Sequence, residues 1–330
     1  MSRRIATGLA LALGGCAGRQ SALDPAADQA SALHGLLGLM LVVSGAAYLL
    51  VLLFLGWAVW RNRRRRSQEV EIEPDDRGLQ LGLGVWTGAM TLGLAVLIGA
   101  SFLVDRTLAQ HDQAAADIRV TGHQWWWRLE YRDPAGGWIE TANELHLPVD
   151  RPTRIELRSA DVIHSFWIPN LSGKIDMIPG RTNHLTLTPR RLGWVRGQCA
   201  EFCGLQHARM ALDVKVDTPQ AFAAWLADQA RPAAAASSPA AARGLGLIAS
   251  GTCASCHTIR GAVAGGRAGP DLTHLASRRS LAAGTLPMTR GALGGWIAQP
   301  QAVKPGAEMP ASGLAPDEAL AIVSYLEGLR

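Results

Sequence analysis

Two long apolar stretches dominate the first third of the chain. Residues Gly35–Trp60 and Gly78–Val104 contain no charged side chain. Each is longer than the roughly 20 residues that a helix needs to cross a bilayer. A buried core helix is the alternative, but uncharged runs above about 18 residues favour a membrane span. We therefore predict a membrane protein with a two-helix transmembrane hairpin, residues 35–60 and 78–104.

The connector between these spans, residues 61–77, sets their orientation. It carries Arg61 and the run Arg63–Arg66, and arginine-rich loops stay in the cytoplasm. The N-terminal segment and everything after residue 105 then lie outside the cytoplasm. The net charge of +5 alone would permit nucleic-acid binding. Because the basic residues gather beside an apolar span and no nucleic-acid motif is visible, we predict no nucleic-acid partner.

The N-terminus has the pattern of an export signal. A basic start, Met1–Arg4, is followed by the short apolar run Ile5–Leu13 and then by Gly-Gly-Cys16. Small residues before a cysteine resemble a bacterial lipoprotein cleavage box. We predict a signal peptide over residues 1–15, a lipid on Cys16 and an exported segment over residues 16–34. An ordinary signal peptide or a cytosolic leader with an incidental cysteine is the alternative.

From about Asp117 the apolar pattern changes to short alternating runs. Gly, Pro and Asp turns separate them, which is typical of an all-β sandwich or barrel. We predict such a domain over residues 112–228. The predicted strands are Ile118–Thr121, Trp125–Tyr131, Glu144–Leu147, Thr153–Leu157, His184–Thr188 and Asp213–Val216.

An Ala/Pro/Ser tract over residues 229–242 separates this domain from the last one. It has no apolar periodicity and is typical of a linker. As a flexible coil it would span roughly 20 Å, which keeps the last domain within reach of the β domain. Residues 243–330 form that domain, where Ala292–Gln299 and Asp317–Leu329 are predicted helices.

A cluster of metal-binding residue types lies near the end of the β domain. Cys199, Cys203, His207 and Met210 follow one another within twelve residues. Thiolate, imidazole and thioether ligands suit copper. Zinc also accepts cysteine and histidine but has no use for a methionine. A Cys199–Cys203 disulfide and a structural zinc loop remain the alternatives.

His164 lies in the run Asp161-Val-Ile-His-Ser-Phe-Trp-Ile-Pro169. A lone histidine among apolar residues is more often part of a core. However, this run and the Cys199–Met210 cluster together resemble subunit II of haem–copper oxygen reductases. The match continues through Lys174–Arg181. The resemblance implies a cupredoxin-like Greek-key fold and a binuclear copper centre, CuA, bridged by Cys199 and Cys203. It further implies that His164 and His207 each bind one copper, that Met210 is a weak ligand and that Glu201 binds through its backbone carbonyl. The carboxylate of Glu201 would reach a magnesium ion at the border with subunit I.

The run Gly122-His-Gln-Trp125-Trp126-Trp127 resembles the aromatic motif of the same family. The resemblance implies that Trp125 is exposed and is the point where electrons enter. Trp126 and Trp127 are as readily explained as core residues. Alternation along a strand would place Trp125 and Trp127 on one face and Trp126 on the other. One departure is Leu83, which stands where the family usually carries a glutamate associated with proton uptake.

The last domain contains Cys253-Ala-Ser-Cys256-His257. The C-x-x-C-H pattern indicates covalent attachment of haem c, with His257 as the proximal ligand. A thioredoxin-like site is the alternative, but no βαβ pattern surrounds the motif. The domain resembles an all-α class I cytochrome c, in which Gly269–Leu272 braces the proximal histidine. Met309 is the predicted distal ligand, and Met288 is then a packing residue.

Taken together, the chain resembles subunit II with a fused cytochrome c domain, as in caa3-type oxidases. The resemblance implies a multi-pass protein of the bacterial inner membrane whose metal domains lie on the periplasmic side. Electrons from soluble cytochrome c would pass through haem c and CuA to haem a of subunit I. Subunit I would also hold haem a3 and CuB, and subunit III would be a further partner. Dioxygen reduction to water and proton pumping would occur in those partners. A CuA subunit of a nitric oxide reductase and a membrane-tethered copper-delivery protein are the alternatives.

Overall fold

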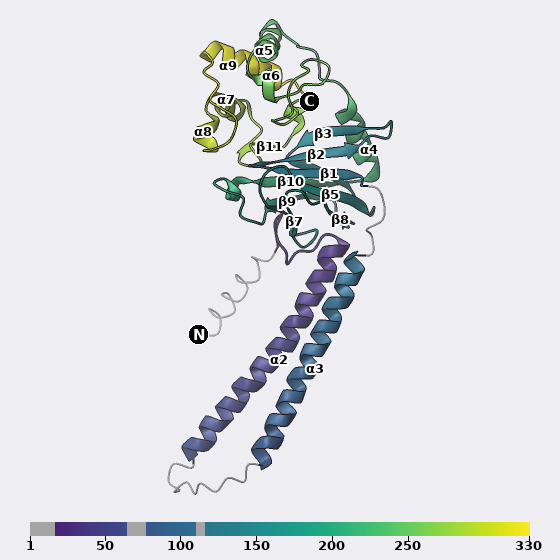
Figure 1. Ribbon diagram of the computed structural model, residues 1–330, viewed down its shortest axis with the longest axis vertical. Helices are drawn as coiled ribbons and strands as arrows, with labels where there is room; N and C mark the ends of the chain where they lie inside the picture. The colour runs from purple at the N-terminus through teal and green to yellow at the C-terminus, as the bar shows by residue number, and fades with distance from the viewer. Residues whose placement is uncertain (1–16, 65–76, 110–115) are drawn as a thin grey trace, which may run out of the picture. The chain divides into compact units, whose positions relative to one another are not determined.

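The computed structural model describes residues 17–64, 77–109 and 116–330. The chain divides into two units, one formed by Ser31–Gln110 and the other by the residues on either side of that stretch (Figure 1). The predicted signal peptide, its Cys16, and Arg65 and Arg66 lie outside the described residues.

The smaller unit consists of two long helices, α2 (Asp28–Arg64) and α3 (Arg77–Ala109). Both are long and apolar enough to cross a membrane, and neither apolar stretch is buried against protein. Leu41 and Leu81, for example, are 64% and 71% exposed. Apolar surface on this scale needs a lipid or protein cover. The two predicted spans are thus confirmed as helices, and each helix is longer than predicted at both ends.

The β domain is a sandwich of two five-stranded sheets (Figure 1). One sheet has the order β3-β2-β1-β5-β8 and the other β4-β10-β9-β6-β7, so that strands distant in sequence lie side by side. Parallel pairs β1–β5 and β10–β4 join otherwise antiparallel ladders. The strands are β1 (Ile118–His123), β2 (Trp126–Arg132), β3 (Trp138–Ala142), β4 (Glu144–Pro148), β5 (Thr153–Ser159), β6 (His164–Trp167), β7 (Ile175–Met177), β8 (Asn183–Leu187), β9 (Gly193–Cys199) and β10 (Ala211–Asp217).

Alternation of buried and half-buried residues explains why these segments form strands. In β1, for example, Ile118 and Val120 point into the core while their neighbours are partly exposed. All six predicted strands are present, although Trp125 lies just before β2 instead of within it. The additional strands β3, β6, β7 and β9 were not predicted. β6 and β7 have only four and three residues, too few to show a period of two.

Strand pairing brings the two metal-binding segments together. Phe166 of β6 pairs with Cys199 of β9, so that His164, two residues earlier, lies beside the end of β9. β9 and β10 pair antiparallel, and Gln198 and Ala211 form the pair nearest to the connecting loop, residues 200–210. This loop is therefore anchored on both sides by sheet.

The first described residues also belong to the sandwich. Ala26 donates its backbone N–H to the carbonyl of Asn170 (2.7 Å), and Gln29 accepts from the N–H of Thr188 (3.0 Å). Arg190 pairs with Asp28. The segment that leads into α2 is thus tied to the β domain by its own contacts.

Helix α4 (Pro219–Ala230) follows the last strand and closes one end of the sandwich. Thr218 caps it by accepting from the N–H of Ala221, and Pro219 is its first residue, as at many helix starts. Its Trp225 stacks on His146, with ring centroids 4.0 Å apart and planes 7° from parallel.

The last domain is helical, with a separate hydrophobic core. Helices α5 and α9 cross closely because Gly244 has no side chain: a Cβ there would lie 2.1 Å from the carbonyl oxygen of Ala321. The helices are α5 (Pro239–Ser250), α6 (Cys253–Cys256), α7 (Arg290–Ala298), α8 (Pro300–Val303) and α9 (Pro316–Leu326), with 3₁₀ turns η2 (His207–Arg209, in the β domain) and η3 (Leu275–Ser277) and the two-residue strands β11 (Ser280–Leu281) and β12 (Leu286–Pro287).

The prediction of a flexible coil over residues 229–242 is wrong. Helix α4 reaches Ala230, and α5 begins at Pro239 with Ser238 as its cap. The residues between them are held by the last domain: Ala233 donates its N–H to the carbonyl of Arg260, and His274 Nε2 lies 3.1 Å from the carbonyl of Arg231. Composition indicated a linker, but backbone hydrogen bonds to a folded neighbour fix its path.

Candidate functional site

The loop between β9 and β10 holds two free thiols at the centre of the site. Cys199 and Cys203 are both buried, and their sulfur atoms lie 3.7 Å apart. A disulfide requires about 2.05 Å, so the alternative of a Cys199–Cys203 bridge does not describe this structure. The N–H of Cys199 donates to the carbonyl of Met210 (2.9 Å), which closes the loop at its base.

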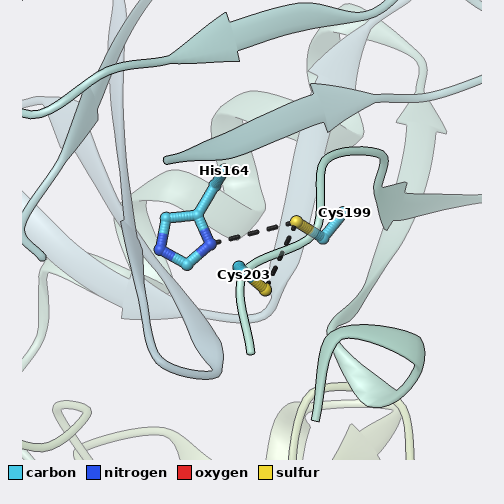
Figure 2. A group of neighbouring side chains, drawn as sticks. All are labelled: His164, Cys199 and Cys203. Carbon is cyan, nitrogen blue, oxygen red and sulfur yellow. Dashed lines mark hydrogen bonds between the residues drawn. The ribbon is translucent and has the colours of Figure 1, made fainter. Parts of the chain in front are cut away.

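His164 approaches the thiols from the neighbouring strand. Figure 2 shows its ring beside Cys199, with Nδ1 3.9 Å from the sulfur. Its other nitrogen, Nε2, lies 2.7 Å from a carboxylate oxygen of Asp161, whose second oxygen accepts from the N–H of Gln124. A carboxylate partner of this kind fixes the tautomer and orientation of a metal-binding histidine.

Gly122 makes room for the His164 ring. A Cβ at this position would lie 2.8 Å from Cδ2 of His164, closer than side-chain carbons approach. The backbone of β1 therefore serves as the floor of the site, and only glycine fits there.

The remaining predicted ligands converge on the same two sulfurs. His207 Nδ1 lies 3.6 Å from the sulfur of Cys203, and the thioether of Met210 lies 3.8 Å from it. The carbonyl of Glu201 lies 3.2 Å from the sulfur of Cys199. All six residues predicted as copper ligands are thus gathered around one point. Two thiols, two imidazoles, a thioether and a carbonyl fit copper, and the thioether distinguishes this set from a zinc site.

Each thiol affects the ionisation of the other. The contact with Cys203, together with hydrogen bonds from His164 and the backbone, lowers the pKa of Cys199 to about 3. The resulting thiolate, with burial, raises the pKa of Cys203. Burial alone would lower the pKa of His164, but Asp161 and Cys199 raise it overall. Because metal binding requires thiolates, a cation between the sulfurs would favour loss of the second proton.

The side chain of Glu201 points away from the thiols. It is 44% exposed, and Oε2 accepts from the ammonium of Lys174 at 3.1 Å. This carboxylate is the predicted magnesium ligand, and its partner within the chain is a lysine.

The cysteines of the C-x-x-C-H motif lie in the short helix α6, at the edge of an apolar cavity. The cavity wall includes Cys253, Cys256, His257 and the predicted distal ligand Met309. His257 Nδ1 lies 2.7 Å from the carbonyl of Pro270, which leaves Nε2 as the nitrogen for a metal. Met288 packs instead against the hydrophobic core of the domain.

Two further observations show that the cavity fits a haem. A Cβ at position 269 would lie 2.5 Å from Cε1 of His257, so glycine lets the ring pack against the backbone. Arg278 lines the cavity with 7% exposure, and its Nε has no hydrogen-bond partner among the residues that the structure describes. A buried, incompletely paired guanidinium suits the propionate carboxylates of a haem.

Trp125 lies between the two sites, and the expectation that it is exposed is wrong. It is 8% exposed, because the helical domain covers it, and its ring forms part of the wall of the apolar cavity beside the C-x-x-C-H motif. Its indole N–H donates to the carbonyl of Cys203 (2.9 Å). Trp127 is also buried and Trp126 is half-buried, and these two neighbours alternate along β2.

Several residues that shape the site were not predicted. Asp161 stood within the quoted motif, but its spacing from His164 gives no sign of a contact. Gln124 donates through its amide to the carbonyl of Cys203, and Lys304 of the helical domain contacts Trp125. These contacts join segments far apart in sequence, and residue types and local spacing do not predict them.

Comparisons with known proteins identify both domains. Residues 135–217 match the family model of the periplasmic domain of cytochrome c oxidase subunit II, and residues 241–330 match that of cytochrome c. The chain is 30% identical to cytochrome c oxidase subunit 2 of Alkalihalophilus pseudofirmus, over 98% of this chain and 95% of the relative. It is 29% identical to the Bacillus subtilis protein of the same name, over 94% and 92%.

Among solved structures, the periplasmic domain of cytochrome oxidase subunit II from Bradyrhizobium japonicum is 34% identical over 34% of this chain and 94% of that chain, with a TM-score of 0.32. The nearly full-length match to cytochrome c oxidase subunit 2 carries the assignment. With its membrane helices, its cupredoxin-like sandwich and its cytochrome c domain, the chain belongs to the cytochrome c oxidase subunit II family, in the form with a fused cytochrome c.

Proposed function

We propose that this chain receives electrons for a terminal oxidase and passes them to subunit I. Electrons from a soluble cytochrome c would reach haem c first, then binuclear CuA, and then haem a. Dioxygen reduction to water and proton pumping would take place in subunit I, with subunit III beside it. The observation that carries this proposal is the convergence of six copper-type ligands next to a haem-type cavity, with Trp125 in contact with both.

The chain's own residues have distinct tasks in this role. The copper centre would supply one one-electron carrier, and haem c, whose potential His/Met ligation raises, would supply a second. Cys199 and Cys203 would bridge the two coppers, and His164 and His207 would each bind one. Met210 and the carbonyl of Glu201 would complete the set. Cys253 and Cys256 would attach the haem, and His257 and Met309 would bind its iron.

Burial in the sandwich core would hold the copper ligands in one geometry. Cys199 and Met210 are 2% and 0% exposed, and sheet anchors both ends of their loop. A site on rigid elements needs little rearrangement when its charge changes. The donor would approach the cytochrome domain, since Trp125 is covered by that domain.

The membrane placement follows from family and helices together. The chain is a membrane-anchored protein with periplasmic domains, and we propose two passes through the bacterial inner membrane. Arg61, Arg63 and Arg64 end α2 and favour a cytoplasmic connector. A lipid on Cys16 would add a second anchor. The half-exposed Glu201 carboxylate would bind magnesium where the chain meets subunit I.

The test uses the purified oxidase complex. Metal analysis, electron paramagnetic resonance and haem absorbance should give two coppers in one mixed-valence signal and one covalent haem c in this chain. Reduced cytochrome c should drive oxygen uptake. Three outcomes would contradict the proposal. A single zinc would favour a structural site, and exchangeable copper would favour a copper carrier. Turnover with nitric oxide in place of dioxygen would favour a nitric oxide reductase.

A further inference from the structure

The loop that carries Met309 lies directly on the copper loop. Gln206 donates its side-chain amide to the carbonyl of Pro305 (2.7 Å), and Arg209 donates to the carbonyl of Val303 (2.5 Å). Both donors lie between the copper ligands Cys203 and Met210. The two metal-ligand loops, one from each domain, are therefore joined by direct hydrogen bonds.

Close packing accompanies these hydrogen bonds. Gly306 adopts a positive φ of 83°, and a Cβ there would lie 3.2 Å from Leu205 and 3.6 Å from the Trp125 ring. Glycine thus permits the turn and the close approach at the same position. The side chain of Gln301 braces the turn from inside the cytochrome domain, through the N–H of Gly306 and the carbonyl of Met309.

Lys304 lies at the centre of this contact and is buried. It is 3% exposed, and its ammonium donates to the carbonyl of Trp125 (2.5 Å) and to the carbonyl of Ala282 (3.2 Å). Lysine is almost never fully buried unless it is paired. Here the ammonium's acceptors among the described residues are neutral carbonyls, one from each domain. Burial lowers the pKa of Lys304 to about 7, which expresses the cost of placing this charge in the interface.

The position of Lys304 relative to the copper site suggests what this charge does. Its acceptor, the carbonyl of Trp125, belongs to the residue whose indole donates to the carbonyl of Cys203. The same Trp125 ring borders the haem-type cavity, as does Lys304. One short chain of contacts therefore runs from the Met309 loop through Lys304 and Trp125 to a copper ligand.

We propose that Lys304 is a positioning residue for electron transfer between the two centres. It holds the Met309 loop on the backbone of Trp125 and so keeps the cytochrome domain docked on the copper loop. The transfer takes one electron from the haem iron, which is oxidised, to the copper centre, which is reduced. Lys304 exchanges neither an electron nor a proton in this step. The inference rests on the proposed function and adds the residue that fixes the geometry.

The test compares Lys304→Met with wild type in the full oxidase complex. Hydrogen–deuterium exchange should rise about tenfold to a hundredfold in peptides covering residues 203–209 and 300–309, because a hydrogen bond to a charged group is lost. After photoreduction of haem c, the first-order transfer to copper should slow by about tenfold or more, since small misplacements reduce rates steeply. The second-order reduction of haem c by soluble cytochrome c should stay unchanged.

Two further variants make the result specific. Gln206→Ala weakens the same contact from the copper side and should give a smaller change in the same direction. Arg243→Met removes a positive charge from the cytochrome domain at an exposed pair with Asp317, away from this contact, and should behave as wild type. Haem absorbance and the copper resonance signal, recorded on every sample, report whether each variant folds and binds its metals.

The outcomes separate the two proposals. Missing copper or haem in wild type would overturn the proposed function. Wild-type exchange and transfer rates in Lys304→Met with both centres present would overturn the positioning role alone. If Lys304→Met does not fold, Gln206→Ala decides, and unchanged exchange and transfer in that variant would count against the inference.

Discussion

The indole N–H of Trp125 donates a hydrogen bond to the backbone carbonyl of Cys203 across 2.9 Å. This contact links the wall of the haem-type cavity directly to Cys203, a proposed copper ligand. Trp125 therefore has a fixed place between the two sites, and a soluble donor protein cannot reach it while the cytochrome domain covers it.

Trp125→Phe should slow transfer from haem c to copper while both centres remain bound. Phenylalanine fills most of the space but cannot donate to the Cys203 carbonyl, so we expect a decrease of about tenfold or more. Photoreduction followed by absorbance at the copper and haem bands measures it. Trp138→Phe is the matched control, because Trp138 lies on β3 and stacks on Arg119. Equal rates in both variants would remove Trp125 from the path.

Cys199→Ser should abolish the two-copper resonance signal and leave the haem c spectrum intact. Serine keeps the shape but offers no thiolate to bridge the metals. His257→Ala should have the reverse effect, with the copper signal retained and the normal haem c spectrum lost. Paramagnetic resonance and absorbance on the same samples check both. Persistence of the two-copper signal in Cys199→Ser would contradict the ligand assignment.

Gly122→Ala should reduce copper binding although residue 122 is not a ligand. The added Cβ would lie 2.8 Å from the His164 ring and must displace it. Overpacking of this kind costs about 1–3 kcal/mol, which thermal unfolding can measure alongside the copper content. Gly246→Ala is the control, because a Cβ there has open space in helix α5. Full copper content in Gly122→Ala would show that β1 tolerates the shift.

The stability of the β domain should decrease as the pH rises above neutrality, through His146. Burial alone would lower the pKa of His146, but Asp217 at 2.8 Å and Glu144 at 3.0 Å outweigh it and raise the pKa. When the pKa of a histidine is higher in the folded state, its stabilising effect is fully present below its unfolded-state pKa of about 6.5. The effect is lost as the pH rises through the folded-state pKa.

The measurement is the thermal midpoint of the full chain from about pH 6 to about pH 9, on both sides of the unfolded pKa. His146→Gln keeps a hydrogen-bond donor but does not titrate, so its midpoint should be lower at pH 6 and should decline less with pH. The Tyr131 hydroxyl also contacts the backbone of His146, and its pKa is raised, which keeps it neutral over this range. An unchanged slope in His146→Gln would assign the pH dependence to another group.

Much of the fold and of the site could be predicted from local patterns. The uncharged runs predicted α2 and α3, and alternation predicted six of the strands. The ligand types at Cys199, Cys203, His207 and Met210 lie within twelve residues, so that one loop could gather them. The C-x-x-C-H motif likewise carries its chemistry in five consecutive residues. In each case the interacting groups are near one another in sequence, and residue type and spacing are enough.

The tertiary structure alone decided what depends on segments far apart. Burial of Trp125 results from a domain that begins more than a hundred residues later, and the contacts of Lys304 and Arg278 arise only once that domain docks. The linker reads as flexible by composition, yet hydrogen bonds to Arg260 and His274 fix it. The sequence thus determined which metals the chain can hold. Packing between its domains determined how the two sites are joined, because side-chain burial and long-range hydrogen bonds depend on neighbours that local spacing does not specify.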